Sequence, residues 1–257
     1  ILKPFLELDY EEFQAKRLLA GAPRGELLRL KRHYLGFCDT RRERNRLREA
    51  AHRCYAALRK LAKVPGIPLP NDLFEDPDDD RVLWTVYQHT SGQTVEFCED
   101  RAQRLQALLQ CAETLSECHA LGVVHRGLCP SCFWVPKDGS RAQVLHWDLA
   151  HMDDQRTIAS RVGATLSESV YCAPEVRRAP SEAGVSADVY AFGASAVELL
   201  GRRRLTGTGE EAMNRALAGL EGKWRTLLVP LVQVDPAQRP KDMAEVADRL
   251  KLVAQTS

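Results

Sequence analysis

The segment "VVHRGLCPSCFWV", residues 123–135, holds reactive side chains between two short apolar runs. A histidine such as His125 can move a proton, and the thiols of Cys129 and Cys132 can bind a metal ion. Proton-transfer chemistry at this point calls for a carboxylate, and Gly127 stands there instead. Three interpretations follow: a catalytic loop, a catalytic loop without its base, and a metal site.

Chain length, net charge, the lengths of the apolar runs and the cysteine count exclude several classes of protein. The chain has 257 residues and a formal net charge of +1, which gives no global reason to expect nucleic-acid binding. No apolar run reaches the roughly 20 residues that span a bilayer, and the eight cysteines sit in apolar patterns that favour reduced, buried thiols. We expect an intracellular, cytoplasmic protein without a membrane span. The first residues already look like folded sequence, which suggests a fragment of a longer protein.

The first third of the chain is expected to form a small sheet. Alternating apolar and polar residues predict strands at 25–37 and 81–89. Residues 1–20 are charged and mixed, which is typical of a helix or an edge element. A turn or hinge follows near residues 88–94 and separates this part from the rest.

One strong helix, about residues 40–63, interrupts these strands. Asp39 or Thr40 can cap it, and its apolar residues fall on one face. The stretch 24–63 holds thirteen Lys and Arg against four Asp and Glu, and six acids follow in residues 71–80. We expect protein partners, and the basic helix, residues 41–63, is the surface that could bind an acidic one. Nucleic acid is not favoured.

The remainder predicts mainly helices, with two short strands. One expected helix ends near Gly122. The others are expected at residues 186–202, 209–220, 222–233 and 240–254. The short strands are expected at residues 133–135 and 143–147. A small part with strands and one long helix therefore precedes a larger helical part, with a cleft at the join.

Five motifs, in order, resemble the eukaryotic-type Ser/Thr protein kinases. They are "CHALGVVHRGL" (118–128), "HWDLA" (146–150), "YCAPEV" (171–176), "SADVYAFGASAVELL" (186–200) and "VDPAQRP" (234–240). The resemblance covers nearly the whole chain. It implies an α+β, two-lobed protein kinase-like fold, with a β-rich N-lobe at residues 1–89 and a helical C-lobe at residues 90–257.

The resemblance also implies structural roles for matching residues. Glu175 and Arg239 should pair and tie the "APE" segment to the C-lobe. Asp188 should accept backbone N–H bonds from the "HRG" loop, and His125 should pack under that loop. For Arg126 we expect a local hydrogen-bonding role.

The positions that perform phosphoryl transfer match less well. The family's catalytic Asp would stand at Gly127, its loop Lys at Cys129 and its metal-binding Asn at Cys132. We therefore expect no catalytic residue here. The Cys-x-x-Cys pair is interpreted as substituted loop positions rather than as a zinc or redox site. Of the metal ligands, only Asp148 matches.

The phosphate-binding elements of the N-lobe leave alternatives open. Lys31 is the preferred lysine of the sheet, with Glu49, eighteen residues later, as its partner. Alternatively, "AGAPRG" (20–25) is a remnant of the Gly-rich loop and the lysine is missing. A different count along the helix puts Cys54 or Tyr55 at the position of Glu49.

We expect a catalytically inactive kinase-like domain, a pseudokinase that is not an enzyme and acts as a scaffold or allosteric protein-interaction module. No resident cofactor or metal is expected. One alternative is a regulatory domain that retains binding of ATP and Mg²⁺ through Lys31, Glu49 and Asp148. Another is a weakly active or atypical kinase.

Overall fold

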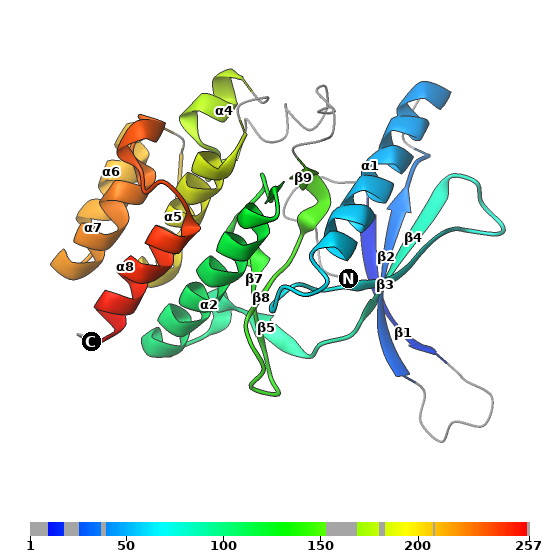
Figure 1. Cartoon of the computed structure of the whole chain (residues 1–257), viewed down its shortest axis with the longest axis horizontal. Coiled ribbons are helices and arrows are strands. Elements are labelled where there is room, and N and C mark those ends of the chain that lie inside the picture. Colours follow the sequence, from blue (N-terminus) through cyan, green and yellow to red (C-terminus); the bar gives the residue numbers. More distant parts are fainter. Residues whose placement is uncertain are drawn as a thin grey trace.

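The computed structural model describes residues 10–17, 26–36, 40–152, 169–179, 183–207 and 209–255. An antiparallel sheet and the long helix α1 form one part, and the remaining helices form the other (Figure 1). This is the two-lobed α+β kinase-like arrangement expected from the sequence. Within the described residues, no helix is both long enough and apolar enough to cross a membrane.

The N-terminal sheet has four strands in the order β1-β2-β4-β3. They are β1 (Tyr10–Arg17), β2 (Glu26–Tyr34), β3 (Pro70–Glu75) and β4 (Val82–Gln88). Strands β2 and β4 fall within the expected ranges, and β1 is an edge strand. Strand β3 is not predicted by the sequence, because "PNDLFE" is mostly polar and exposed and looks like the start of the acidic loop.

The register of the two central strands, β2 and β4, decides which side chains share the face of the sheet that is covered by the rest of the protein. Lys31 on β2 pairs with Thr85 on β4, and Arg29 pairs with Tyr87. Since side chains alternate along a strand, these four share one face of the sheet. Lys31 and Thr85 are only 3% and 4% exposed, respectively, so this face is the covered one.

Helix α1 (Arg41–Lys60) lies between the sheet and the helical part (Figure 1). Thr40 caps it, and its hydroxyl oxygen accepts from the backbone N–H of Glu43 at 3.2 Å. Three side chains at helical spacing form the buried face: Cys54, Ala57 and Leu58. The basic residues occupy the other faces, as the sequence predicts.

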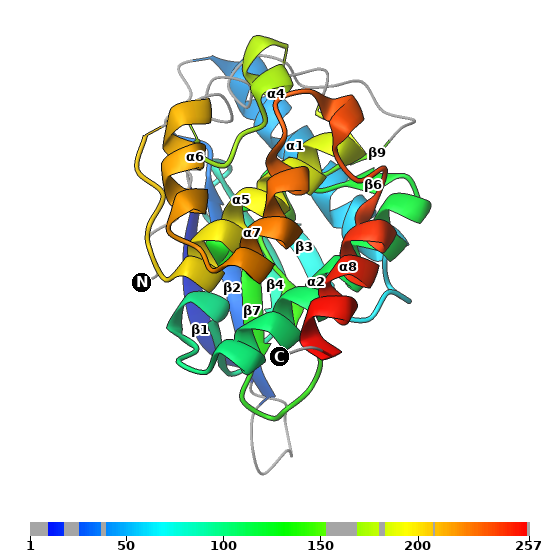
Figure 2. The ribbon, with the colours of Figure 1, turned by 90° about the vertical axis from the view of Figure 1, so that its left-hand side faces the viewer.

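The described residues of the C-terminal part form these helices: α2 (Arg101–Ala120), α4 (Pro174–Arg178), α5 (Val185–Gly201), α6 (Glu210–Ala218), α7 (Gly222–Leu228) and α8 (Met243–Gln255). Helix α5 is buried from Ala187 to Leu200, and it lies at the centre of this part (Figure 2). Helix α4 is not among the helices that the sequence predicts. The expected helix 222–233 changes after α7 into a 3-10 turn that contains Pro230.

Strand β5 (Gly92–Thr94) precedes α2 and pairs with β7. Between α2 and α4 the described residues form further short strands: β6 (Val123–Val124), β7 (Phe133–Pro136), β8 (Gln143–Val144) and β9 (His151–Met152). Strands β7 and β8 pair antiparallel, and so do β6 and β9. Together they hold the loop 125–132 beside Asp148.

Glu175 and Arg239 lie together, in the arrangement that the kinase resemblance implies. The guanidinium of Arg239 donates to both carboxylate oxygens of Glu175, at 2.7 and 2.8 Å. It also donates to the backbone carbonyls of Gln233, Ser186 and Val234. With its donors satisfied, this buried pair links α4 to α5 and to the turn before α8.

Candidate functional site

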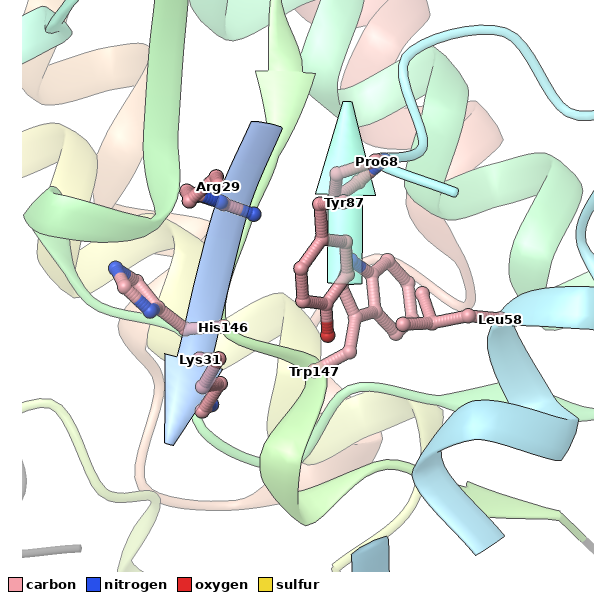
Figure 3. Close-up of a pocket in the computed structure, with 7 residues that line it drawn as sticks. All are labelled: Arg29, Lys31, Leu58, Pro68, Tyr87, His146 and Trp147. Carbon is pink, nitrogen blue, oxygen red and sulfur yellow. The ribbon is translucent and has the colours of Figure 1, made fainter. Parts of the chain in front are cut away.

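A pocket opens between β2, β4, α1 and the segment around Asp148 (Figure 3). Seven residues line it: Arg29, Lys31, Leu58, Pro68, Tyr87, His146 and Trp147. Two aromatic rings and Leu58 lie beside the charged groups of Arg29 and Lys31. The cavity has a volume of only about 10 Å³, far below the roughly 300–1,000 Å³ of an ordinary small-molecule site, so a larger ligand requires the sheet and the helical part to move apart.

Lys31 and Asp148 form a buried ion pair at this pocket. Lys31 comes from β2 and Asp148 from the 3-10 helix η3 (Trp147–Leu149). The ammonium group contacts Oδ1 of Asp148, and the two side chains are 4% and 13% exposed. Burial alone would raise the pKa of Asp148, but the charge and hydrogen bond of Lys31 lower this pKa to about 2. The carboxylate is therefore charged at neutral pH.

The second oxygen of this carboxylate suits a cation. Oδ2 of Asp148 is buried and has no hydrogen-bond partner among the described residues, a condition that costs about 1–3 kcal/mol. Mg²⁺ is commonly held by one or two carboxylates together with phosphate oxygens of a substrate. Asp148 offers one such ligand. Cys132, at the position of a second ligand, offers a thiol that Mg²⁺ does not favour, so the residues present fit a single Mg²⁺.

Glu49 does not reach the Lys31–Asp148 pair. Its side chain is 66% exposed, and its carboxylate lies 3.9 Å from Arg53 on the outer face of α1. Cys54 faces the site instead, and its thiol donates to the carbonyl of Trp147 at 3.1 Å. Five residues separate Glu49 from Cys54, about 1.4 helical turns, so the two point in different directions. The expected nucleotide role of Glu49 is therefore corrected, and the alternative count, with Cys54 in that place, agrees with the structure.

Residues 20–25, the alternative Gly-rich loop, lie outside the described residues. The described strands nearest to them in sequence, β1 and β2, pair antiparallel. Lys31 is on the second of these strands and lines the pocket.

Asp188 holds the loop at residues 125–127. Its carboxylate accepts from the backbone N–H groups of His125 and Arg126, both at 2.8 Å, and lies 2.9 Å from Nε2 of His119. Burial alone would raise the pKa of Asp188, but the hydrogen bond from His119 and the nearby histidines lower it. Because Asp188 lies in the first turn of α5, the helix dipole also favours its negative charge.

His125 supports the loop from within the core. It is fully buried, its Nε2 lies 2.9 Å from the carbonyl of Leu145, and its Nδ1 accepts from the backbone N–H of Gly127 at 3.3 Å. Nε2 therefore carries the proton. Burial lowers the pKa of His125, which keeps the ring neutral against Trp147, with the ring centroids 4.6 Å apart.

Arg126 and Gly127 shape the loop where a base would stand. Arg126 has a left-handed backbone with φ of 68°, and its Nε donates to the carbonyl of Ala183 at 3.0 Å. A Cβ atom on Gly127 would lie 3.0 Å from Cδ1 of Leu149, which is the end of a flexible side chain. The loop therefore has the hydrogen bonds that position it and no carboxylate at residue 127.

The thiols of Cys129 and Cys132 lie 3.5 Å apart in this loop. The described part of the chain contains no group of three or more His, Cys, Asp or Glu side chains arranged to hold a metal ion. All seven described cysteines are buried and none forms a disulfide. Cys38 lies outside the described residues.

No protein-family model matches the chain. It is similar to the serine/threonine-protein kinase pkn2 of Myxococcus xanthus, with 27% identity over 165 residues that cover 57% of this chain and 20% of that kinase. It is also similar to CBL-interacting protein kinase 4 of Oryza sativa subsp. japonica, with 33% identity over 95 residues that cover 37% of this chain and 20% of the relative. The chain thus matches about a fifth of the length of these relatives. With the two-lobed fold, these partial similarities support membership of the protein kinase-like superfamily.

The comparisons contradict the expectation that the chain is not an enzyme. Both relatives are named as protein kinases. The expectation rested on substituted loop positions, above all Gly127. Phosphoryl transfer depends mainly on positioning and electrostatic stabilisation, and in this chain Lys31, Asp148 and a well-anchored loop are still together.

Proposed function

We propose that this chain is a kinase-like domain that binds a magnesium nucleotide beside Lys31 and Asp148 and transfers a phosphoryl group slowly. The observation that carries the proposal is the buried Lys31–Asp148 pair at a pocket with aromatic walls. An ammonium group suits phosphate oxygens, and the unpartnered Oδ2 of Asp148 suits Mg²⁺. The rings of Tyr87 and Trp147 are 7% and 2% exposed, so a planar base stacks on them only once the pocket has opened.

Some residues of the chain would bind the magnesium nucleotide, and others would position the loop that receives the acceptor hydroxyl. Asp148 would hold Mg²⁺, which neutralises phosphate charge when bound, and Lys31 would orient the phosphates. Asp188, through the backbone of residues 125 and 126, keeps the loop in place for an acceptor hydroxyl. Gly127 brings no group that could take the proton of that hydroxyl, and a general base typically contributes about 10²–10⁴-fold to a rate. Transfer without it should be slow.

Nucleotide binding should raise the melting temperature of the full chain. We expect an increase of about 5 °C or more with Mg-ATP at about 100 times its Kd. Lys31→Met and Asp148→Asn should each abolish this increase, measured against each variant's own melting temperature without nucleotide. Glu49→Gln, on the exposed face of α1, is the matched control and should keep it.

Each single variant leaves one buried charge without its partner and destabilises the fold. The double variant Lys31→Met/Asp148→Asn leaves neither charge, so it tests binding in a folded chain. An increase in this double variant equal to that of the wild type would contradict the proposed site.

A carboxylate at residue 127 should raise the rate of phosphoryl transfer. The φ of Gly127 is not left-handed, and the Cβ atom of an Asp at this position asks only that the side chain of Leu149 move. We expect Gly127→Asp to increase kcat for a generic protein substrate by about 10²-fold or more over the wild type. Gly127→Ala is the matched control, since it adds the same Cβ without the carboxylate. Equal rates in the Asp and Ala variants would contradict the role assigned to this position.

We also propose that α1 docks an acidic segment of a partner protein, which gives the domain a scaffold role. The supporting observation is a contact with the chain's own acidic loop. Arg48 lies 3.0 Å from the carboxylate of Glu75 and donates to the carbonyl of Asp80. Arg41 and Arg42, a little under two helical turns earlier, are exposed and extend this basic surface.

The docking surface can be tested with a poly-glutamate peptide as the probe. Arg42→Glu should weaken binding at least about threefold, and added salt should weaken binding to the wild type. Lys137→Glu makes the same charge change on the exposed turn after β7 and should leave the affinity unchanged. Equal losses in the two variants would indicate a general charge effect and contradict docking on α1.

A further inference from the structure

The two thiols of the loop are held close to the geometry of a disulfide. Cys129 is the cap of the 3-10 helix η2 (Pro130–Cys132), and the backbone N–H of Cys132 donates to the carbonyl of Cys129 at 2.9 Å. This turn keeps both side chains on one side, with their sulfur atoms 3.5 Å apart. A disulfide bond is about 2.0 Å long. Side-chain rotations that bring the two sulfur atoms about 1.5 Å closer would therefore allow the bond to form.

The two thiols also differ in their hydrogen bonds, as a nucleophile and its partner should. Sγ of Cys129 lies 3.2 Å from the hydroxyl of Ser131 and faces the thiol of Cys132. Hydrogen bonds from Cys132 and Ser131 outweigh burial and lower the pKa of Cys129. Burial raises the pKa of Cys132. It also raises the pKa of the thiols at positions 54, 111, 118 and 172.

We propose that Cys129 and Cys132 are a reversible dithiol–disulfide pair, oxidised by a hydroperoxide. The Cys129 thiolate attacks the peroxide, so that an S–O bond forms, the O–O bond breaks and hydroxide or an alkoxide leaves, which water then protonates. The Cys132 thiol then attacks the sulfenic sulfur; an S–S bond forms, the S–O bond breaks and water leaves. The two cysteines together lose two electrons to the peroxide, and an external dithiol reverses the change by exchange.

Burial selects the kind of oxidant. Cys129 and Cys132 are 4% and 0% exposed, so a small hydroperoxide reaches them more readily than a bulky disulfide. Their mutual contact favours the disulfide over further oxidation of either sulfur, because the second thiol is already beside the first.

Oxidation also changes the loop at the position of the missing base. In the dithiol form, the S–H of Cys129 can donate to Sγ of Cys132, which leaves the single S–H of Cys132 to donate to the carbonyl of Gly127 at 3.5 Å. The disulfide has no S–H group, so this hydrogen bond is lost, and Gly127 lies against Leu149, next to Asp148. The pair can therefore alter the loop whether or not the pocket binds a nucleotide.

The experiment treats the full chain with hydrogen peroxide and maps the peptides by mass spectrometry. In the wild type we expect residues 129–132 to lose two hydrogen atoms, and a dithiol reductant to restore them. In Cys132→Ser we expect a sulfenic acid at Cys129, with one added oxygen atom, trapped by a dimedone reagent. Cys129→Ser should show neither product in this loop.

The control is Cys172→Ser, which removes another buried thiol and should behave like the wild type. Circular dichroism checks that each variant is folded. If a variant at Cys129 or Cys132 does not fold, the peptide map of the wild type alone shows whether these two cysteines form a disulfide. The proposal is overturned if residues 129–132 keep both thiols while the peroxide oxidises an added thiol peptide. It is also overturned if either cysteine pairs with a different one. Neither result bears on nucleotide binding by Lys31 and Asp148.

Discussion

The rest of the site depends on one buried ion pair, between Lys31 on the sheet and Asp148 at the edge of the helical part. The two residues are 117 positions apart in the chain. A buried charge without a partner is strongly destabilising, so each residue constrains where the other can be. The pair therefore fixes which face of β2 is covered and how closely η3 approaches the sheet. Cys54 completes the contact from α1, through the carbonyl of Trp147.

A second set of hydrogen bonds fixes the loop independently of that pair. The carboxylate of Asp188 accepts hydrogen bonds from two backbone N–H groups of the loop, and the side chain of His125 fills the space beneath the loop. Arg126, in the same turn, has a left-handed backbone conformation. These contacts need no chemistry at residue 127. This explains how a loop can keep its shape with Gly127 in place of a carboxylate, and why the proposed activity is slow transfer.

Much of this could be predicted from the sequence, and the failures have physical causes. The ordered motifs located Asp148, Asp188, and the Glu175–Arg239 pair, because each motif fixes a residue within a few positions. Spacing does not identify the residue of α1 that faces Lys31, because the rotation of a helix against a sheet depends on packing. Strand β3 escapes prediction because an exposed edge strand needs no apolar alternation. The expectation of no enzyme rests on the substitutions at Gly127, Cys129 and Cys132, and it gives them more weight than the relatives support.

Isothermal titration calorimetry of the full chain with ATP, in the presence and absence of Mg²⁺, can test whether a magnesium nucleotide binds beside Lys31 and Asp148. We expect saturable binding of one nucleotide per chain with Mg²⁺ and clearly weaker binding without it, because Oδ2 of Asp148 is assigned to the metal. The absence of binding heat with Mg²⁺ at nucleotide concentrations of about 1 mM, or an affinity that Mg²⁺ does not change, would contradict this expectation.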